Sequence, residues 1–112
     1  MKRIFLNGKI RDVSITALHP DYEGSIVIDE EYMERAGILP FEEVHVLNLN
    51  AGTRIITYAI KGERGSACVE LNGPAARHGM VGDDVMVLTY AILEPGEIAD
   101  HKPKIVSANQ KR

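Results

Sequence analysis

The chain has 112 residues, of which 45% are hydrophobic, and a formal net charge of −3; this size predicts one domain with one ordinary core. The acidic balance and an aromatic content of 5% argue against a nucleic-acid-binding protein, because phosphate binding needs a positive surface and base stacking needs aromatic rings. No apolar run approaches the roughly 18 residues of a membrane span, and no secretory signal is recognisable, so we expect a cytoplasmic protein.

The predicted secondary structure is mainly β. Short segments rich in Val, Ile, Thr and Tyr alternate with turn-forming residues, a pattern typical of the strands of a small barrel. Tight turns are predicted at residues 50–53 and 62–65. The expected strands cover residues 4–6, 13–16, 25–28, 44–49, 54–60, 67–71, 85–92 and 104–107.

One helix is expected directly after residue 28. Asp29 is a good N-cap, and the glutamates that follow it suit the first turn of a helix. Gly37 offers a C-terminal stop, and Pro40 prevents continuation. A second short helix or turn is expected at residues 74–78, and a loose tail at residues 108–112.

The cysteine and the histidines give no sign of a metal site or a disulfide. Cys68 is the only cysteine and stands in an apolar run, which is typical of a buried position. The spacing of His19, His45, His78 and His101 does not match a set of metal ligands. The common motifs of serine nucleophiles and phosphate-binding loops are also absent from the sequence. Patterns of this kind therefore indicate only a small β domain.

Three further motifs occur in order along the chain. Residues 22–29 read Tyr-Glu-Gly-Ser-Ile-Val-Ile-Asp, residues 54–58 read Arg-Ile-Ile-Thr-Tyr, and residues 72–76 read Asn-Gly-Pro-Ala-Ala, with Lys9 upstream. Together they resemble the pyruvoyl-dependent aspartate decarboxylases, and the resemblance extends from residue 2 to residue 107. It implies that family's fold, a small six-stranded double-psi β-barrel with one or two short helices, assembled as a homotetramer.

The resemblance also implies the activity, which is decarboxylation of L-aspartate to β-alanine and CO2 for pantothenate and coenzyme A synthesis. The chain would be a zymogen that cleaves itself between Gly24 and Ser25, giving a β chain of residues 1–24 and an α chain of residues 25–112. Ser25 would become the pyruvoyl group, a covalent cofactor that binds the substrate amine as a Schiff base. Gly24 suits this cleavage because glycine tolerates unusual backbone angles and leaves its carbonyl open to attack. Cleavage is either autonomous or dependent on a maturation factor.

Each remaining motif residue receives a role from the resemblance. Arg54 would grip a substrate carboxylate through its forked guanidinium, and Lys9 would place a second cation beside the pyruvoyl group. Tyr58 would return a proton to the α-carbon, and Thr57 would assist self-cleavage and contact the substrate. Further substrate contacts would come from the loop and the segment before the cleavage site, namely Asn72, Gly73, Pro74, Ala75 and Tyr22.

Thr57 and Tyr58 are neighbours in an expected strand, so their side chains point to opposite sides of it. They are therefore not expected to serve one site of one protomer in the same manner. A site between protomers resolves this conflict, and the family is similar in that respect.

The sequence departs from the family pattern at two positions. Arg11 stands where a histidine is common, and it could either tighten aspartate binding or point to solvent. Pro74 replaces an alanine of the loop; it cannot donate a backbone hydrogen bond, and it could stiffen the loop.

Three alternatives stay open from the sequence alone. One is a small β-barrel that binds or scaffolds without catalysis, and another is a nucleic-acid-binding barrel. The third is a decarboxylase of a related acidic amino acid such as glutamate.

Overall fold

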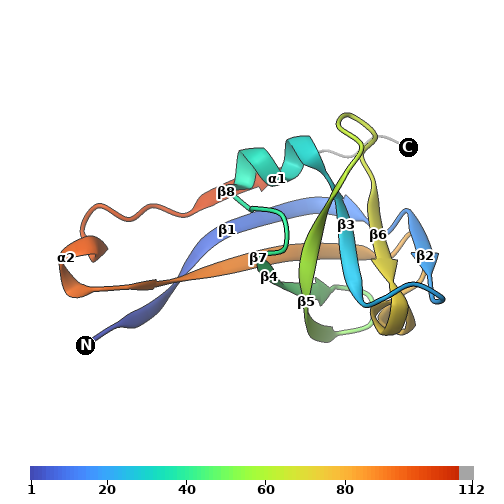
Figure 1. Cartoon of the computed structure of the whole chain (residues 1–112), viewed down its shortest axis with the longest axis horizontal. Coiled ribbons are helices and arrows are strands. Elements are labelled where there is room, and N and C mark those ends of the chain that lie inside the picture. Colours follow the sequence, from blue (N-terminus) through green and yellow to red (C-terminus); the bar gives the residue numbers. More distant parts are fainter. Residues whose placement is uncertain (109–112) are drawn as a thin grey trace.

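The computed structural model describes residues 1–108; most of the tail that was expected to be loose lies outside the described residues. Within them the chain forms eight strands and three short helices (Figure 1). In chain order these are β1 (Arg3–Ser14), β2 (Ala17–His19), β3 (Ser25–Asp29), α1 (Glu30–Ala36), β4 (Glu43–Asn48), β5 (Thr53–Gly62), β6 (Val69–Asn72), the 3₁₀ helix η1 (Gly73–His78), β7 (Asp84–Leu93), α2 (Pro95–Ile98) and β8 (Lys104–Ser107).

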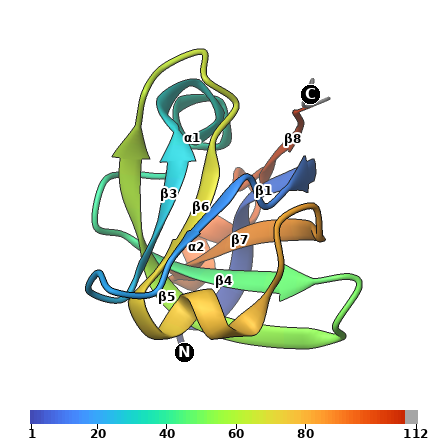
Figure 2. The same cartoon turned by 90° about the vertical axis from the view of Figure 1, so that its right-hand side faces the viewer.

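The strands form one strongly curved sheet in the order β2-β6-β3-β5-β4-β7-β1-β8. Strand β5 joins its two parts, because β5 pairs in parallel with β3 on one edge and antiparallel with β4 on the other. Figure 2 shows β3, β5 and β6 facing β1, β4 and β7 across a common interior. Paired β1 and β7 continue beyond this barrel as a two-stranded ribbon that ends at α2 (Figure 1).

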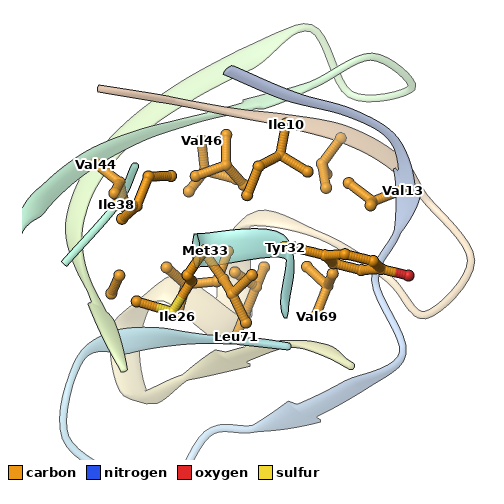
Figure 3. Packing of buried hydrophobic residues seen from close by; sticks show 14 of the residues in the cluster. Ile10, Val13, Ile26, Tyr32, Met33, Ile38, Val44, Val46, Val69 and Leu71 are labelled. Atoms are coloured by element: carbon orange, nitrogen blue, oxygen red, sulfur yellow. The ribbon is translucent and has the colours of Figure 1, made fainter. Parts of the chain in front are cut away.

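The core lies between the two parts of the sheet (Figure 3). Alternate residues of each strand enter it, as the two-residue period of a strand requires; on β4 these are Val44, Val46 and Asn48. Helix α1 contributes Tyr32 and Met33. The larger fully buried aliphatic side chains are Ile10, Ile15, Ile26, Ile28, Leu71, Val13, Val44, Val69, Val85 and Val87.

Cys68 is buried at the edge of this core, as the apolar run predicts, and its burial raises the pKa of the thiol.

Helix α1 begins and ends where the sequence predicts. Asp29 is the N-cap, and its carboxylate accepts a hydrogen bond from the backbone N–H of Glu31 at 2.8 Å. Gly37 ends the helix in the left-handed region, with φ of 71°, which glycine adopts at little cost. The carboxylate of Asp29 also accepts from the N–H groups of Gly65 and Ala67, so one buried side chain ties the helix start to the β5–β6 turn.

The expected turns and the second helix are confirmed. Residues 49–52 close the β4–β5 hairpin, and Ser66 N–H bonds the Glu63 carbonyl in the turn after β5. The helix expected at residues 74–78 is the 3₁₀ helix η1.

Strand β1 differs from the sequence prediction. Residues 4–6 and 13–16 were expected as two strands, but β1 runs without a break from Arg3 to Ser14. Its pairing with β7 shifts register between Leu6 and Gly8 and again between Ile10 and Val13. Bulges of this kind let a segment with weak strand preference stay in the ladder, and Asp12 adopts a φ of 62° in the second one.

Strand β2 and helix α2 were not predicted, since they span only three and four residues. The described residues hold eight strands instead of the six expected for the barrel. Short strands β2 and β8 lie at the two edges of the sheet and extend the barrel without changing its class.

Replacing Asp29 by alanine should destabilise the protein strongly. The side chain is 1% exposed and serves three backbone N–H groups, so its loss leaves buried donors without partners. We expect the free energy of unfolding to fall by about 3 kcal/mol, measured by urea denaturation. Glu34→Gln, which removes an exposed ion pair with Arg64, is the control and should change stability little. Equal effects of the two substitutions would contradict this account of Asp29.

Candidate active site

The predicted cleavage point lies where the β2–β3 loop enters the sheet. Ser25 is the first residue of β3 and is 1% exposed. Its hydroxyl accepts a hydrogen bond of 3.0 Å from the side-chain amide of Asn72, the residue directly opposite it on β6. The other atom of that amide group, Oδ1 of Asn72, is buried and has no hydrogen-bond partner among the described residues. Buried acceptors normally have a partner, so this oxygen is available to a further group beside Ser25.

A cavity of about 220 Å³ opens beside this serine. Gly24, Thr57, Pro74 and Ala75 line it, together with Ile55, Ile56 and His78. Four of the residues predicted for the site therefore meet in one cavity, although they come from three separate parts of the chain. The inward side of β5 supplies Thr57, and η1 supplies Pro74 and Ala75.

Gly73, the first residue of η1, lies against the segment that precedes the predicted cleavage point. Its φ is 59°, and a Cβ atom there would lie 2.3 Å from the carbonyl oxygen of Tyr22 and 2.7 Å from the backbone nitrogen of Gly24. Only glycine allows the two backbones to approach this closely.

The side chain of Tyr22 is 62% exposed and stacks on His19, with ring centroids 5.1 Å apart. Nε2 of His19 in turn lies 2.8 Å from a carboxylate oxygen of Glu70. Neither His19 nor Glu70 was predicted as a site residue, because their contact joins positions 51 residues apart in the chain. Together they support the segment just before Gly24.

Gly24 itself does not need the conformational freedom that the sequence interpretation assigned to it. Its φ lies outside the left-handed region, and an added Cβ would make an ordinary contact of 3.5 Å with Cδ of Pro74. The other part of that interpretation, an open approach to the Gly24 carbonyl group, stays a prediction.

The rest of the 72–83 loop is anchored by Asn48, a buried residue at the end of β4. Its side-chain amide donates to the His78 carbonyl at 3.2 Å and to the Asp83 carboxylate at 2.9 Å. That hydrogen bond and one from the Met80 N–H hold the pKa of Asp83 below its usual range.

Arg54 and Tyr58 point away from the cavity. They alternate with Thr57 along β5, and neither of them lines the cavity. Ile56 between them borders the cavity but is 59% exposed, so this side of β5 faces mainly outward. The sequence-based inference that Thr57 and Tyr58 face opposite ways therefore agrees with the structure.

Lys9 lies on the same outward side as Arg54 and Tyr58. It is opposite Leu88 on β7, Leu88 is opposite His45 on β4, and His45 is opposite Ile56 on β5. Residues directly opposite each other in a ladder share one side of the sheet. Within one protomer the predicted site residues thus form two groups, an inward group at the cavity and an outward group of Lys9, Arg54 and Tyr58.

Arg54 is held by two residues that the sequence analysis did not select. Its Nη1 atom lies 3.1 Å from Nδ1 of His45 and 3.4 Å from the hydroxyl of Tyr90. Counting back from the predicted 50–53 turn pairs Arg54 with Leu49, whereas the observed turn at residues 49–52 pairs it with Leu47 and so brings His45 diagonally across from it. The position of Tyr90 could not be found in this way, because β7 joins β4 only through long-range pairing.

The two departures from the family pattern have plain structural settings. Arg11 is exposed and lies 3.8 Å from the carboxylate of its neighbour Asp12, so it points to solvent in the protomer. Pro74 is the second residue of η1, where a missing N–H and a fixed φ suit the first turn of a helix.

No group of three or more His, Cys, Asp or Glu side chains in residues 1–108 is placed to hold a metal ion. Among the same residues, no helix is long and apolar enough to cross a membrane.

The fold and the motif residues match one protein family. The family model described as aspartate decarboxylase matches residues 1–112, so the chain belongs to the aspartate decarboxylase family, whose fold is a double-psi β-barrel. Three relatives are all named aspartate 1-decarboxylase. The one from Psychromonas ingrahamii is 46% identical over 95% of this chain and 84% of its own length. That from Thermoanaerobacter pseudethanolicus is 44% identical over 98% and 94%, and that from Exiguobacterium sibiricum 46% over 99% and 87%.

Gly73→Ala should distort the segment before the cleavage point. Gly52→Ala is a matched control, because Gly52 also has a positive φ, of 71°, but an added Cβ there meets nothing within 4 Å. Both variants carry the strain of a left-handed alanine, about 1 kcal/mol, and only Gly73→Ala adds a backbone clash. We expect a clearly larger fall in the thermal unfolding midpoint for Gly73→Ala. Equal shifts would mean that the two loops separate easily.

Proposed function

We propose that the chain is a zymogen that cleaves itself between Gly24 and Ser25 and then decarboxylates L-aspartate to β-alanine and CO2. The observation that carries this proposal is the buried Ser25 hydroxyl, fixed by Asn72 beside the cavity that Gly24 lines. The product would serve pantothenate synthesis in the cytoplasm. Membership of the aspartate decarboxylase family supports this activity and disfavours a non-catalytic barrel.

Cleavage begins with attack of the Ser25 hydroxyl oxygen on the Gly24 carbonyl carbon, which converts the peptide bond into an ester. Elimination then releases the carboxylate of Gly24 and leaves a dehydroalanine, and water converts that residue into a pyruvoyl group with loss of ammonia. The Asn72 amide assists because a donor at the serine oxygen stabilises the negative charge that builds there. Thr57 lines the same cavity as Gly24 and assists at the scissile carbonyl.

The residues around Ser25 fit the pyruvoyl group. The unpartnered Oδ1 of Asn72 and the cavity beside Gly24 provide a polar contact and room for a small substrate. The group supplies an electron sink for the carbon that loses CO2. Asn72, Gly73 and Ala75 contact the substrate on this side, with Pro74 and Tyr22 at the border of the site.

The outward group completes the reaction from a neighbouring protomer. Arg54 grips one carboxylate of aspartate, Lys9 adds the second positive charge, and Tyr58 returns a proton to the α-carbon. A strand presents successive side chains to opposite sides, so one β5 strand cannot offer Thr57 and Tyr58 to a single site. A site formed where the inward cavity of one protomer meets the outward side of the next removes this conflict.

Exposed apolar side chains support an assembly of this kind. They lie on the outward side of the sheet and along the β1–β7 ribbon, where exposed apolar side chains do not stabilise a monomer. The residues concerned are Ile4, Ile56, Ile92 and Ile105, each more than half exposed. We propose a homotetramer, in which each site takes residues from two copies.

Intact mass spectrometry under denaturing conditions tests the cleavage. We expect two fragments that break after Gly24, with the larger one lighter by one ammonia than a chain beginning with serine. Ser25→Ala removes the nucleophile and should stay one species. A wild-type chain that stays whole, even after addition of a cell extract to supply a maturation factor, would contradict the proposal. Turnover of L-aspartate and L-glutamate by the cleaved protein then identifies the substrate.

Complementation between two inactive variants tests the shared site. Ser25→Ala lacks the pyruvoyl precursor and Tyr58→Phe lacks the proton donor, so each should form no β-alanine alone. In mixed assemblies from co-expression, about a quarter of the sites should combine an intact Ser25 with an intact Tyr58 from the neighbour. Recovery of activity is expected. Mixed assemblies, verified through two different affinity tags, that stay inactive would place the whole site within one protomer.

A further inference from the structure

His45 stands at the centre of a cluster on the outward side of the barrel. Strands β5 and β7 flank β4, and Arg54 and Tyr90 each lie two residues beyond the partner directly opposite His45. The ring of Tyr90 meets the imidazole edge-on, with centroids 4.9 Å apart and planes inclined by 65°. Three neighbouring strands thus bring an arginine, a histidine and a tyrosine into contact at one point.

The direction of the Arg54–His45 hydrogen bond follows from chemistry. A guanidinium has only donors, so Nδ1 of His45 must accept from Nη1 of Arg54 and carries no proton. The proton of the neutral ring is then on Nε2. That atom lies 3.8 Å from a carboxylate oxygen of Glu43, two residues earlier on the same side of β4. At that distance the carboxylate is not a hydrogen-bond partner of Nε2, so the tautomer is set by the contact of Nδ1 with Arg54.

Both contacts of Arg54 use the same nitrogen. Nη1 faces His45 Nδ1 and the Tyr90 hydroxyl, whereas its hydrogen bonds in residues 1–108 involve neither Nε nor Nη2. The N–H groups of the Nε–Nη2 edge have the spacing to donate two parallel hydrogen bonds to a carboxylate. The cluster thus fixes one side of the guanidinium and leaves the other side available.

We propose that His45, packed against Tyr90, is a positioning residue that fixes Arg54 for the substrate carboxylate. This inference rests on the proposed function, in which Arg54 binds aspartate. An exposed arginine loses considerable side-chain freedom when it binds a ligand, and a guanidinium that is already held loses less. His45 thereby acts on substrate affinity through Arg54 and has no contact with the reacting atoms.

Two substitutions at position 45 separate the hydrogen bond from the shape of the ring. His45→Phe keeps an aromatic ring against Tyr90 but has no acceptor. His45→Asn replaces the ring but keeps an oxygen at the same number of bonds from Cβ as Nδ1. For L-aspartate we expect His45→Phe to raise KM roughly tenfold with little change in kcat, as loss of a hydrogen bond to a charged group predicts. His45→Asn should restore most of the affinity.

A second readout does not depend on turnover. In ¹⁵N NMR spectra, hindered rotation should give Arg54 separate guanidinium signals in the wild type and in His45→Asn, assigned by their loss in Arg54→Lys. These signals should average in His45→Phe. An unchanged KM and unchanged Arg54 signals in His45→Phe would overturn the proposal, as would a loss confined to kcat. A wild-type protein that cleaves but makes no β-alanine would instead overturn the proposed function, and the NMR comparison would still decide the role of His45.

Discussion

The alternation of side chains along β5 is the constraint on which the arrangement of the site depends. This strand belongs to both parts of the sheet, so it cannot rotate without breaking its ladders with β3 and β4. Its inward side places Thr57 at the cavity, and its outward side carries Arg54 and Tyr58. The barrel therefore separates the cavity residues from Arg54 and Tyr58 by one sheet. Under the proposed function, a second protomer would be needed to bring the two groups together.

The cavity side depends on backbone contacts more than on charged side chains. Gly73 presses against the segment at Tyr22, and Asn48 anchors the far end of the same loop. The outward side depends instead on side-chain hydrogen bonds, above all those of Arg54. The cavity residues can be rigid within a single chain, whereas Arg54 lies on the exposed side of the sheet. This difference in contacts follows from the side of the sheet on which each group lies.

Local chemistry made much of the fold predictable. The cap at Asp29 and the stop at Gly37 located α1, and turn residues located the β4–β5 hairpin. The long strand β1 was divided in the prediction because its bulges keep weak strand formers paired, which depends on β7 and not on local preference. Most of the proposed site residues come from the ordered motifs, and their roles stay predictions. His45, Tyr90, His19 and Glu70 were missed, because their contacts depend on strand register and long-range pairing.

The place of the proposed cut has a consequence for how the protein survives it. Residues 1–24 supply β1, which is hydrogen-bonded on both edges by β7 and β8, and β2, which lies along β6. Cleavage before Ser25 would leave the shorter fragment paired with strands of the longer one, with no covalent bond between the two. Refolding from denaturant would then be a bimolecular encounter of two fragments, where the precursor needed one chain alone. The cleaved protein would therefore keep its fold once formed, but it would refold from denaturant less readily than its precursor.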